Sequence, residues 1–149
     1  MIDGVRATPV NLAVDERGRL LDLLCLGESD LPACGYVGMV TAYPGVVKAW
    51  RGHRRRTDCL VVIHGMAKVV LFDVREGSAT CGQTDEFFLG IWNPVRLRIP
   101  PGVYHGFQCI STGEAMLIGL SDLPRGLQDP DEMSLPADAP EIGYDWTRK

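Results

Sequence analysis

Two stretches of the sequence carry a histidine together with other side chains suited to proton transfer or anion binding. Residues 44–58 contain Arg51 and His53, and residues 99–107 contain His105. Both stretches follow turn-forming residues and are rich in strand-forming types, so we expect two strands that face one another across a small barrel. Side chains alternate along a strand, which places Arg51 and His53 on one face about 6–7 Å apart. If that face lines a cavity, the site is cationic and contains an imidazole.

The same alternation assigns different roles to neighbouring residues of the first stretch. It places Lys48 and Trp50 on the face opposite to His53. An imidazole is the commonest side-chain base near neutral pH, whereas arginine stays protonated and can only stabilise an anion. His53 is therefore a candidate base and Arg51 a candidate oxyanion stabiliser. His105 is either a second cavity residue or a buried structural histidine that bonds to the backbone.

A metal site and a phosphate site are alternatives for the same residues. His53, Asp58 and His105 could form a set of two histidines and one carboxylate, but Arg51 would add a positive charge beside the ion. We therefore expect no metal and no other cofactor. The arginines at 54–56 are either merely solvated or bind phosphate, for which a planar guanidinium is well suited.

Length and composition exclude several classes of protein. The 149 residues suit one domain spanning 1–149, and 46% hydrophobic residues are typical of a globular chain. A net charge of -4 argues against a nucleic-acid partner. The five cysteines are odd in number and form no Cys-x-x-Cys motif, which indicates reduced thiols and a cytoplasmic protein. No apolar run is long enough to span a membrane.

Strand signals that could position these residues recur along most of the chain, with no helical segment between them. Residues 1–14 predict one short first strand, and 19–26 fit either a strand or a helix. From residue 124 an acidic, proline-rich tail is expected to be coil with at most one helical turn, and Ile142, Tyr144 and Trp146 should pack it onto the barrel. This pattern predicts an all-β sandwich or closed barrel. The other expected strands are 36–43, 46–50, 58–64, 67–73, 84–89, 96–99, 105–110 and 115–120.

Five motifs lie at residues 15–18, 45–50, 73–82, 99–107 and 140–146. In their order and spacing they resemble the dTDP-4-dehydrorhamnose 3,5-epimerase family of the cupin superfamily. The resemblance implies a cupin-type jelly-roll β-barrel, a homodimer, and a nucleotide sugar or other anionic ligand in the barrel mouth. The chemistry it implies begins when a histidine, oriented by an aspartate, removes a proton next to a ketone. A lysine then stabilises the enolate, and a tyrosine protonates the opposite face.

The chain departs from the family pattern at the catalytic positions. Arg51 stands where the family has its basic histidine, and Asp58 stands where it has the lysine. The tyrosine position falls at Ile118 or Gly119, and the orienting aspartate falls at Ala139. These replacements predict either an altered catalytic set or a barrel that binds its ligand without turnover.

The leading hypothesis is an epimerase or isomerase that acts on a nucleotide-linked 4-keto-6-deoxy sugar, or on a related carbonyl compound. The proton would be transferred by His105 or by His53, which lies two residues beyond the family's usual histidine position. Arg51 and Lys48 would stabilise the anion. The second hypothesis is a non-catalytic ligand-binding or accessory barrel, and the third is a metal-dependent cupin enzyme. Further substrate contacts are expected from Arg17, Trp50, Asp73, Arg75 and Tyr104.

Overall fold

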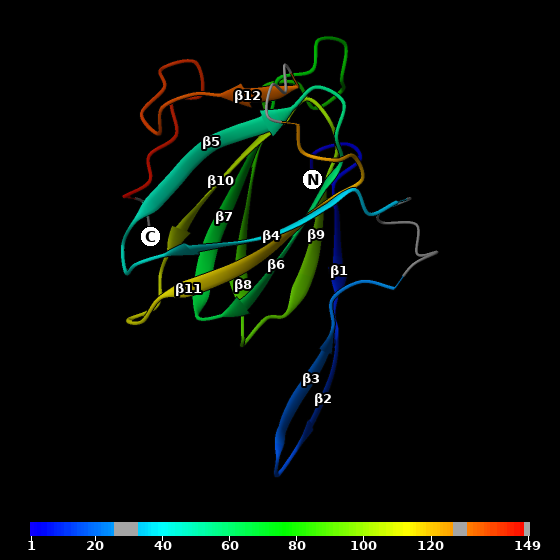
Figure 1. Cartoon of the computed structure of the whole chain (residues 1–149). Helices are drawn as coiled ribbons and strands as arrows, with labels where there is room; N and C mark the ends of the chain where they lie inside the picture. The colour runs from blue at the N-terminus through cyan, green and yellow to red at the C-terminus, as the bar shows by residue number, and fades with distance from the viewer. Residues whose placement is uncertain (26–32, 127–130, 148–149) are drawn as a thin grey trace.

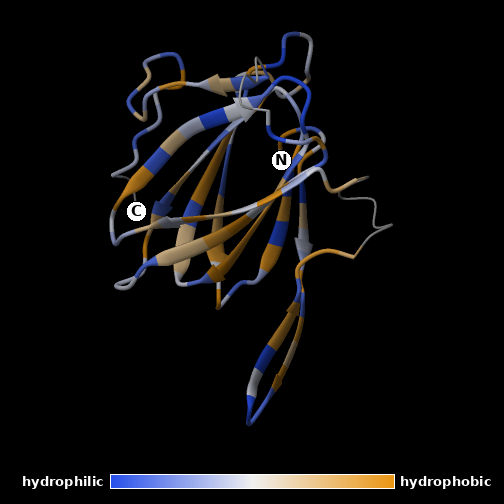
Figure 2. Cartoon of the chain, in the orientation of Figure 1, coloured by the Kyte–Doolittle hydropathy of each residue, from blue (hydrophilic) through white to orange (hydrophobic). Residues whose placement is uncertain are grey.

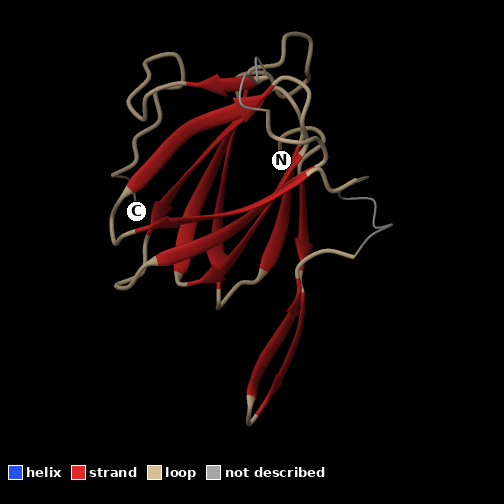
Figure 3. Cartoon of the chain, viewed as in Figure 1, coloured by secondary structure: helices blue, strands red, loops and turns tan. Residues whose placement is uncertain are grey.

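The fold is built from strands, turns and loops. The computed structural model describes residues 1–25, 33–126 and 131–147, and in these ranges it contains twelve strands and no helix (Figure 3). The all-β prediction is therefore confirmed for the described chain. The strands are β1 (Arg6–Pro9), β2 (Asn11–Asp15), β3 (Gly18–Asp22), β4 (Tyr36–Ala42), β5 (Val47–His53), β6 (Asp58–His64), β7 (Met66–Asp73), β8 (Thr84–Gly90), β9 (Val95–Ile99), β10 (Val103–Cys109), β11 (Ala115–Ser121) and β12 (Glu132–Ser134).

Ten of these strands form two five-stranded sheets that face one another. One sheet has the order β1-β9-β6-β11-β4, and the other has the order β12-β5-β10-β7-β8. All pairings are antiparallel, and the arrangement is the jelly-roll barrel expected from the resemblance (Figure 1). β2 and β3 form a separate hairpin that extends away from the barrel.

Turn chemistry explains why the strands end where they do. Gly65 joins β6 to β7 with a φ of 67°, a left-handed conformation that favours glycine. A Cβ at this position would lie 2.6 Å from the carbonyl oxygen of Glu114, so a side chain there would also clash. The strands on either side begin and end within one residue of the expected ranges, 58–64 and 67–73.

The hydrophobic core lies between the two sheets and fills one part of the barrel. Inward-facing residues of the central strands are buried and form one cluster. Figure 2 shows apolar segments, in orange, along β6, β7 and β9. Each such large side chain stabilises the fold by about 1.5–3 kcal/mol through burial. The largest fully buried members of this cluster are Ile2, Val62, Val69, Leu71, Leu89, Leu97, Ile99 and Leu117.

The structure corrects the expected relation between the two histidine-bearing strands. β5 and β10 do not face one another across the barrel, because they are hydrogen-bonded neighbours in one sheet. Arg51 lies directly opposite His105 in this pairing. Antiparallel neighbours place such partners about 4.5–5.5 Å apart at Cα, so all the candidate bases lie on the same wall.

The two ends of the chain also differ from the sequence prediction. The expected first strand is divided into β1 and β2, and the ambiguous segment that follows contains a strand, β3. The proline-rich tail forms the edge strand β12, paired with β5, where a coil with at most one helical turn was expected. Three residues are too few to carry a recognisable period-2 signal, which explains why this strand was missed.

The end of the tail packs against the outer face of the β5 sheet, as predicted. Trp146 lies against Trp50, with ring centroids 5.1 Å apart, and Tyr144 contacts both rings. The buried Lys68 ammonium donates a hydrogen bond to the Trp146 carbonyl oxygen at 3.1 Å.

All five cysteines are free thiols. Among the described residues, no helix could cross a membrane.

Candidate functional site

The open part of the barrel contains a cavity lined by both sheets. An inner pocket of about 150 Å³ adjoins a wider pocket of about 610 Å³, and the two share several lining residues. One wall of the inner pocket carries Arg51, His53, His105 and Glu132, from β5, β10 and β12. The opposite wall is made by β4, β6 and β11 and contributes Tyr36, Asp58, Leu60, Gly119 and Ser121.

A bulge in β5 decides which side chains reach this cavity. The register pairs Arg51 with His105 but Lys48 with Phe107, so two residues of β5 oppose the single residue Gly106. The extra residue shifts the alternation by one position. Lys48 and Arg51 therefore both line the wider pocket, although strict alternation predicted opposite faces.

His53 lies between two carboxylates at the inner end of the cavity. Its Nε2 atom is 3.4 Å from Oδ2 of Asp58, and its Nδ1 atom is 3.7 Å from Oδ2 of Asp131. The imidazole is only 13% exposed. Burial lowers the pKa of His53, Asp58 opposes that shift, and nearby Arg56 and His105 reinforce it. The result is a neutral, carboxylate-flanked imidazole, which is the form that can accept a proton.

Asp131 is held as a carboxylate by the segment that follows β5. The backbone amide of Arg56 donates a hydrogen bond to it at 3.2 Å, and the Arg55 Nε atom lies 3.4 Å away. Burial alone would raise the pKa of Asp131, but these hydrogen bonds and the nearby His53 bring it below the ordinary value. Asp131 is therefore a charged group suited to orient His53.

Asp58 occupies the other side of His53 and belongs to the opposite sheet. Its Oδ1 atom accepts a hydrogen bond from the Ser121 hydroxyl. Burial raises the pKa of Asp58, while His53 and the Ser121 hydrogen bond act in the opposite direction. The contact between Asp58 and His53 thus links the two walls of the cavity.

His105 supplies a second imidazole on the same wall as His53. Burial and the neighbouring Arg51 guanidinium lower its pKa to about 4, so the ring is neutral at physiological pH. Within the described part of the chain, its buried Nδ1 atom has no hydrogen-bond partner. The alternative of a structural histidine bonded to the backbone therefore finds no support at this nitrogen, and His105 lines both the inner and the wider pocket.

Positive side chains gather around the wider pocket. Arg51 pairs with Glu132 at 2.7 Å, yet its side chain is 62% exposed. Lys48 and Arg125 line the same pocket, and neither forms an ion pair with a described carboxylate. The pocket is therefore suited to an anionic ligand such as a phosphate ester.

Three residues predicted as substrate contacts do not bring their side chains into this cavity. The Trp50 ring is fully buried in the cluster with Tyr144 and Trp146, although the residue belongs to the pocket lining. Tyr104 packs against that same outer cluster. Arg17 is 83% exposed at the tip of the β2–β3 hairpin and pairs with Asp15.

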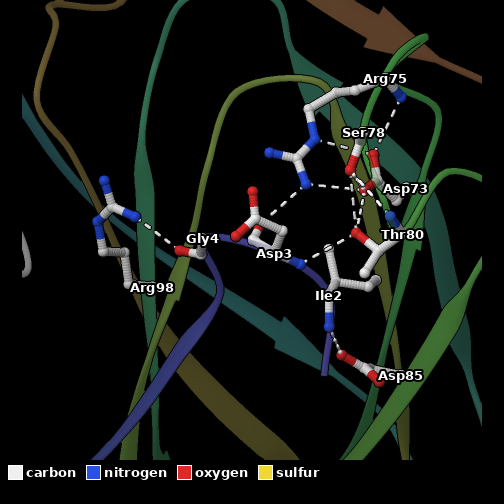
Figure 4. A network of polar contacts seen from close by, with 9 residues as sticks. All are labelled: Ile2, Asp3, Gly4, Asp73, Arg75, Ser78, Thr80, Asp85 and Arg98. Carbon is white, nitrogen blue, oxygen red and sulfur yellow. Dashed lines mark hydrogen bonds and ion pairs between the residues drawn. The ribbon is translucent and has the colours of Figure 1, made fainter.

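Asp73 and Arg75, also predicted as substrate contacts, form a separate polar network (Figure 4). Asp73 is fully buried and accepts hydrogen bonds from Arg75, Ser78 and Thr80. Arg75 also donates to the carbonyl oxygen of Asp3 at 2.8 Å, which fixes the N-terminal segment. Neither residue lines the inner or the wider pocket, so the geometry indicates a structural role.

Sequence reasoning missed some of the cavity's polar residues. Asp131 and Glu132 lie about 80 positions after the strand they contact, and only the pairing of β12 with β5 brings them there. Tyr36 was assigned to a strand without a role. The metal alternative has no support in the described ranges, because no group of three or more His, Cys, Asp or Glu residues there could hold an ion.

This arrangement can carry out proton transfer to and from carbon. A neutral imidazole flanked by carboxylates is a general base, and cationic groups beside it can stabilise a developing enolate oxygen. Both sheets line the cavity, so a substrate in it would have protein groups on two sides.

Comparisons with known proteins show a family match and similar proteins over nearly the whole chain. Residues 43–149 match the family model described as dTDP-4-dehydrorhamnose 3,5-epimerase. The chain is 36% identical to "Spore coat polysaccharide biosynthesis protein SpsL" of Bacillus subtilis, over 98% of this chain and 97% of that protein. It is 34% identical to "Probable low-salt glycan biosynthesis epimerase Agl13" of Haloferax volcanii, over 97% and 94% of the respective chains. A crystal structure of a dTDP sugar isomerase from Desulfovibrio desulfuricans aligns with a TM-score of 0.93 and 31% identity, covering 98% of this chain and 92% of that one.

Proposed function

The chain belongs to the dTDP-4-dehydrorhamnose 3,5-epimerase family, and we propose that it inverts a carbon next to the ketone of a nucleotide-linked 4-keto-6-deoxy sugar. The observation that carries this proposal is the position of His53 between Asp58 and Asp131, inside the cavity. It supplies an oriented base although Arg51 stands at the family's usual histidine position. The altered catalytic set is therefore compatible with turnover.

In the proposed reaction, neutral His53 removes the proton from the carbon next to the ketone. Asp131 and Asp58 stabilise the imidazolium that forms, because each carboxylate lies within 4 Å of one ring nitrogen. His105 and Arg51 stabilise the enolate oxygen, since they are neighbours on the same wall. The nucleotide would extend into the wider pocket, where Lys48 and Arg125 bind its phosphates.

Product analysis tests this function directly. The purified protein is incubated with a dTDP-4-keto-6-deoxyhexose, and the configuration next to the ketone is read by NMR. We expect inversion at one or both flanking carbons. Thermal stabilisation by the nucleotide sugar without inversion would instead support the alternative, a barrel that binds its ligand without turnover. Neither inversion nor stabilisation would reject the nucleotide-sugar ligand.

The pH dependence of the reaction follows from the pKa shifts of the two histidines. Burial lowers the pKa of His53 from 6.5 and that of His105 to about 4, so both stay neutral where a free imidazole begins to protonate. A base works in its neutral form, so activity is lost only as the pH falls through the lowered pKa values. We expect the acidic fall in kcat/KM to be centred below pH 6.5, the pKa of a free imidazole. An acidic limb centred above pH 6.5 would contradict this assignment.

We also propose a homodimer in which the β2–β3 hairpin lies on a second copy of the chain. The hairpin extends away from its own barrel (Figure 1), and its Val14 and Leu20 side chains are 70% and 64% exposed. A lone two-stranded hairpin is marginally stable in water, and packing on a partner would bury these residues. In such a dimer, Arg17 at the hairpin tip would contact the phosphates of a ligand in the partner's cavity.

Charged substitutions in the hairpin test the dimer. We expect the double variant Val14→Asp and Leu20→Asp to run as a monomer in size-exclusion chromatography with light scattering, because two buried carboxylates oppose association. Trp92→Asp is the matched control, since Trp92 is 83% exposed in the turn after β8 and lies outside the hairpin. A monomeric wild-type protein, or a double variant that stays dimeric, would contradict the proposed interface.

A further inference from the structure

The two walls of the cavity differ in the groups that could transfer a proton, and the proposed reaction needs such a group on each wall. The candidate bases His53 and His105 both lie on the wall formed by β5 and β10. Inversion at carbon requires a proton to leave one face of the carbon and another proton to reach the opposite face. The second proton must therefore come from the wall formed by β4, β6 and β11. That wall has no tyrosine at the position where the family carries one, because Ile118 and Gly119 stand there.

Tyr36 extends into the cavity from this opposite wall. It lines both the inner and the wider pocket and begins β4, with Ser121 as its partner on β11. A Cβ atom on Gly38 would lie 2.1 Å from the Tyr36 hydroxyl oxygen and 2.7 Å from Cζ. The phenol ring therefore runs along the inner face of β4 and places its hydroxyl over Gly38. Only a residue without a side chain at 38 allows this position.

The neighbouring strand leaves the space beside this hydroxyl open. Gly38 is paired with Gly119 on β11. A Cβ on Gly119 would meet nothing closer than the Leu60 Cδ2 atom at 3.6 Å. These two glycines, paired across β4 and β11, thus form a recess in the wall. The Tyr36 hydroxyl lies beside this recess, next to the position where the family tyrosine would be.

The other polar groups of that wall are already engaged. The Ser121 hydroxyl donates to Asp58, and Asp58 lies 3.4 Å from the Nε2 atom of His53. The Tyr36 hydroxyl, by contrast, has no hydrogen-bond partner among the described residues. The Arg125 guanidinium lies 5.8 Å from the Tyr36 ring centroid, where its charge would favour the tyrosinate left after proton transfer.

We propose that Tyr36 is the catalytic acid that protonates the enolate on the face opposite to His53, a role that rests on the proposed epimerase function. His53 first takes the proton from carbon, which leaves an enolate and an imidazolium. The Tyr36 O–H bond then breaks as a new C–H bond forms on the other face, which leaves a tyrosinate. Proton exchange with water returns His53 and Tyr36 to their starting states, and no oxidant or further reactant is needed.

Tyr36→Phe tests this role, because it removes only the hydroxyl. Reactions run in deuterium oxide distinguish exchange, which needs the base alone, from inversion, which needs both groups. We expect inversion to fall by about 10²-fold or more, while deuterium incorporation with retained configuration stays within about tenfold of wild type. Tyr43→Phe is the control, since Tyr43 is 72% exposed and lines neither pocket. Circular dichroism and thermal melting confirm that the variants are folded.

A second variant, Gly38→Ala, keeps the hydroxyl but moves it. Its new Cβ would occupy the space of the Tyr36 hydroxyl, and we expect the same loss of inversion with exchange retained. Wild-type inversion in Tyr36→Phe would overturn the assignment, as would an equal loss of exchange and inversion, which indicates a role in binding or in positioning the base. A wild-type protein that shows neither exchange nor inversion would reject the epimerase function itself, and the role of Tyr36 with it.

Discussion

Replacing His53 by alanine is expected to reduce both epimerisation and solvent exchange by about 10²–10⁴-fold, the usual contribution of a general base. The reason is geometric: the imidazole contacts Asp58 and Asp131 and lines the inner pocket. Arg51, although it stands at the usual base position, cannot accept a proton near neutral pH. Initial rates of deuterium incorporation for the variant and the wild type measure the effect.

His64→Ala is the matched control for this experiment. His64 is an exposed histidine at the end of β6 and lines neither pocket, so its loss should leave both rates within about twofold of wild type. Exchange that persists at the wild-type rate in His53→Ala would contradict the assignment. The base would then be sought at His105, the other neutral imidazole of that wall.

Replacing Asp73 by alanine is expected to destabilise the fold by about 3–5 kcal/mol, because it leaves the Arg75 guanidinium without its buried partner. Asp73 is fully buried and accepts hydrogen bonds from Arg75, Ser78 and Thr80. For a chain of this length the melting temperature should fall by roughly 10 °C. KM for the sugar nucleotide should change little at a temperature where the variant is folded, since Asp73 does not line the cavity.

The same carboxylate makes a pH-dependent contribution to stability. Burial alone would raise the pKa of Asp73, but the hydrogen bonds from Arg75 and Thr80 hold it far below the ordinary value of 3.8. Its contribution is therefore fully present above about pH 4 and is lost as the pH falls further.

Asp138→Ala, at an exposed site in the tail, is the control for Asp73→Ala and should change stability by less than about 0.5 kcal/mol. A melting temperature for Asp73→Ala within one or two degrees of wild type would reject the structural role.

Local sequence signals were sufficient for most of the fold. β6 spans the expected residues 58–64, and the apolar residues of the tail dock as expected. Such features depend on residues within one strand or one turn. β12 was missed because three residues are too few to carry a strand signal, and this segment becomes a strand by pairing with β5.

The candidate site was harder to predict, since its geometry depends on strand order and on one bulge. His53 and Arg51 were expected to share a cavity wall, and both line it. The bulge opposite Gly106, which brings Lys48 to the same side, has no signature in the alternation of β5. Asp131 reaches His53 from a distant part of the chain, a contact that no local pattern contains.

The two substrate contacts that were expected from the resemblance alone do not line this chain's own inner or wider pocket. Arg17 and Arg75 match family motifs, yet Arg17 lies on the projecting hairpin and Arg75 binds Asp73. A shared motif can preserve a fold-stabilising network as well as a ligand contact. Tyr36 shows the converse case, because its position depends on the glycine at 38 rather than on any family motif.

Position-resolved solvent exchange in the wild-type protein tests the central claim most directly. A dTDP-4-keto-6-deoxyhexose is incubated with the protein in deuterium oxide, and deuterium at the two carbons flanking the ketone is followed by NMR. The cavity geometry predicts enzyme-dependent incorporation at one or both carbons, with inverted product appearing alongside it. The absence of incorporation, under conditions where the nucleotide sugar raises the melting temperature and therefore binds, would contradict the claim that His53 acts as a base in this barrel.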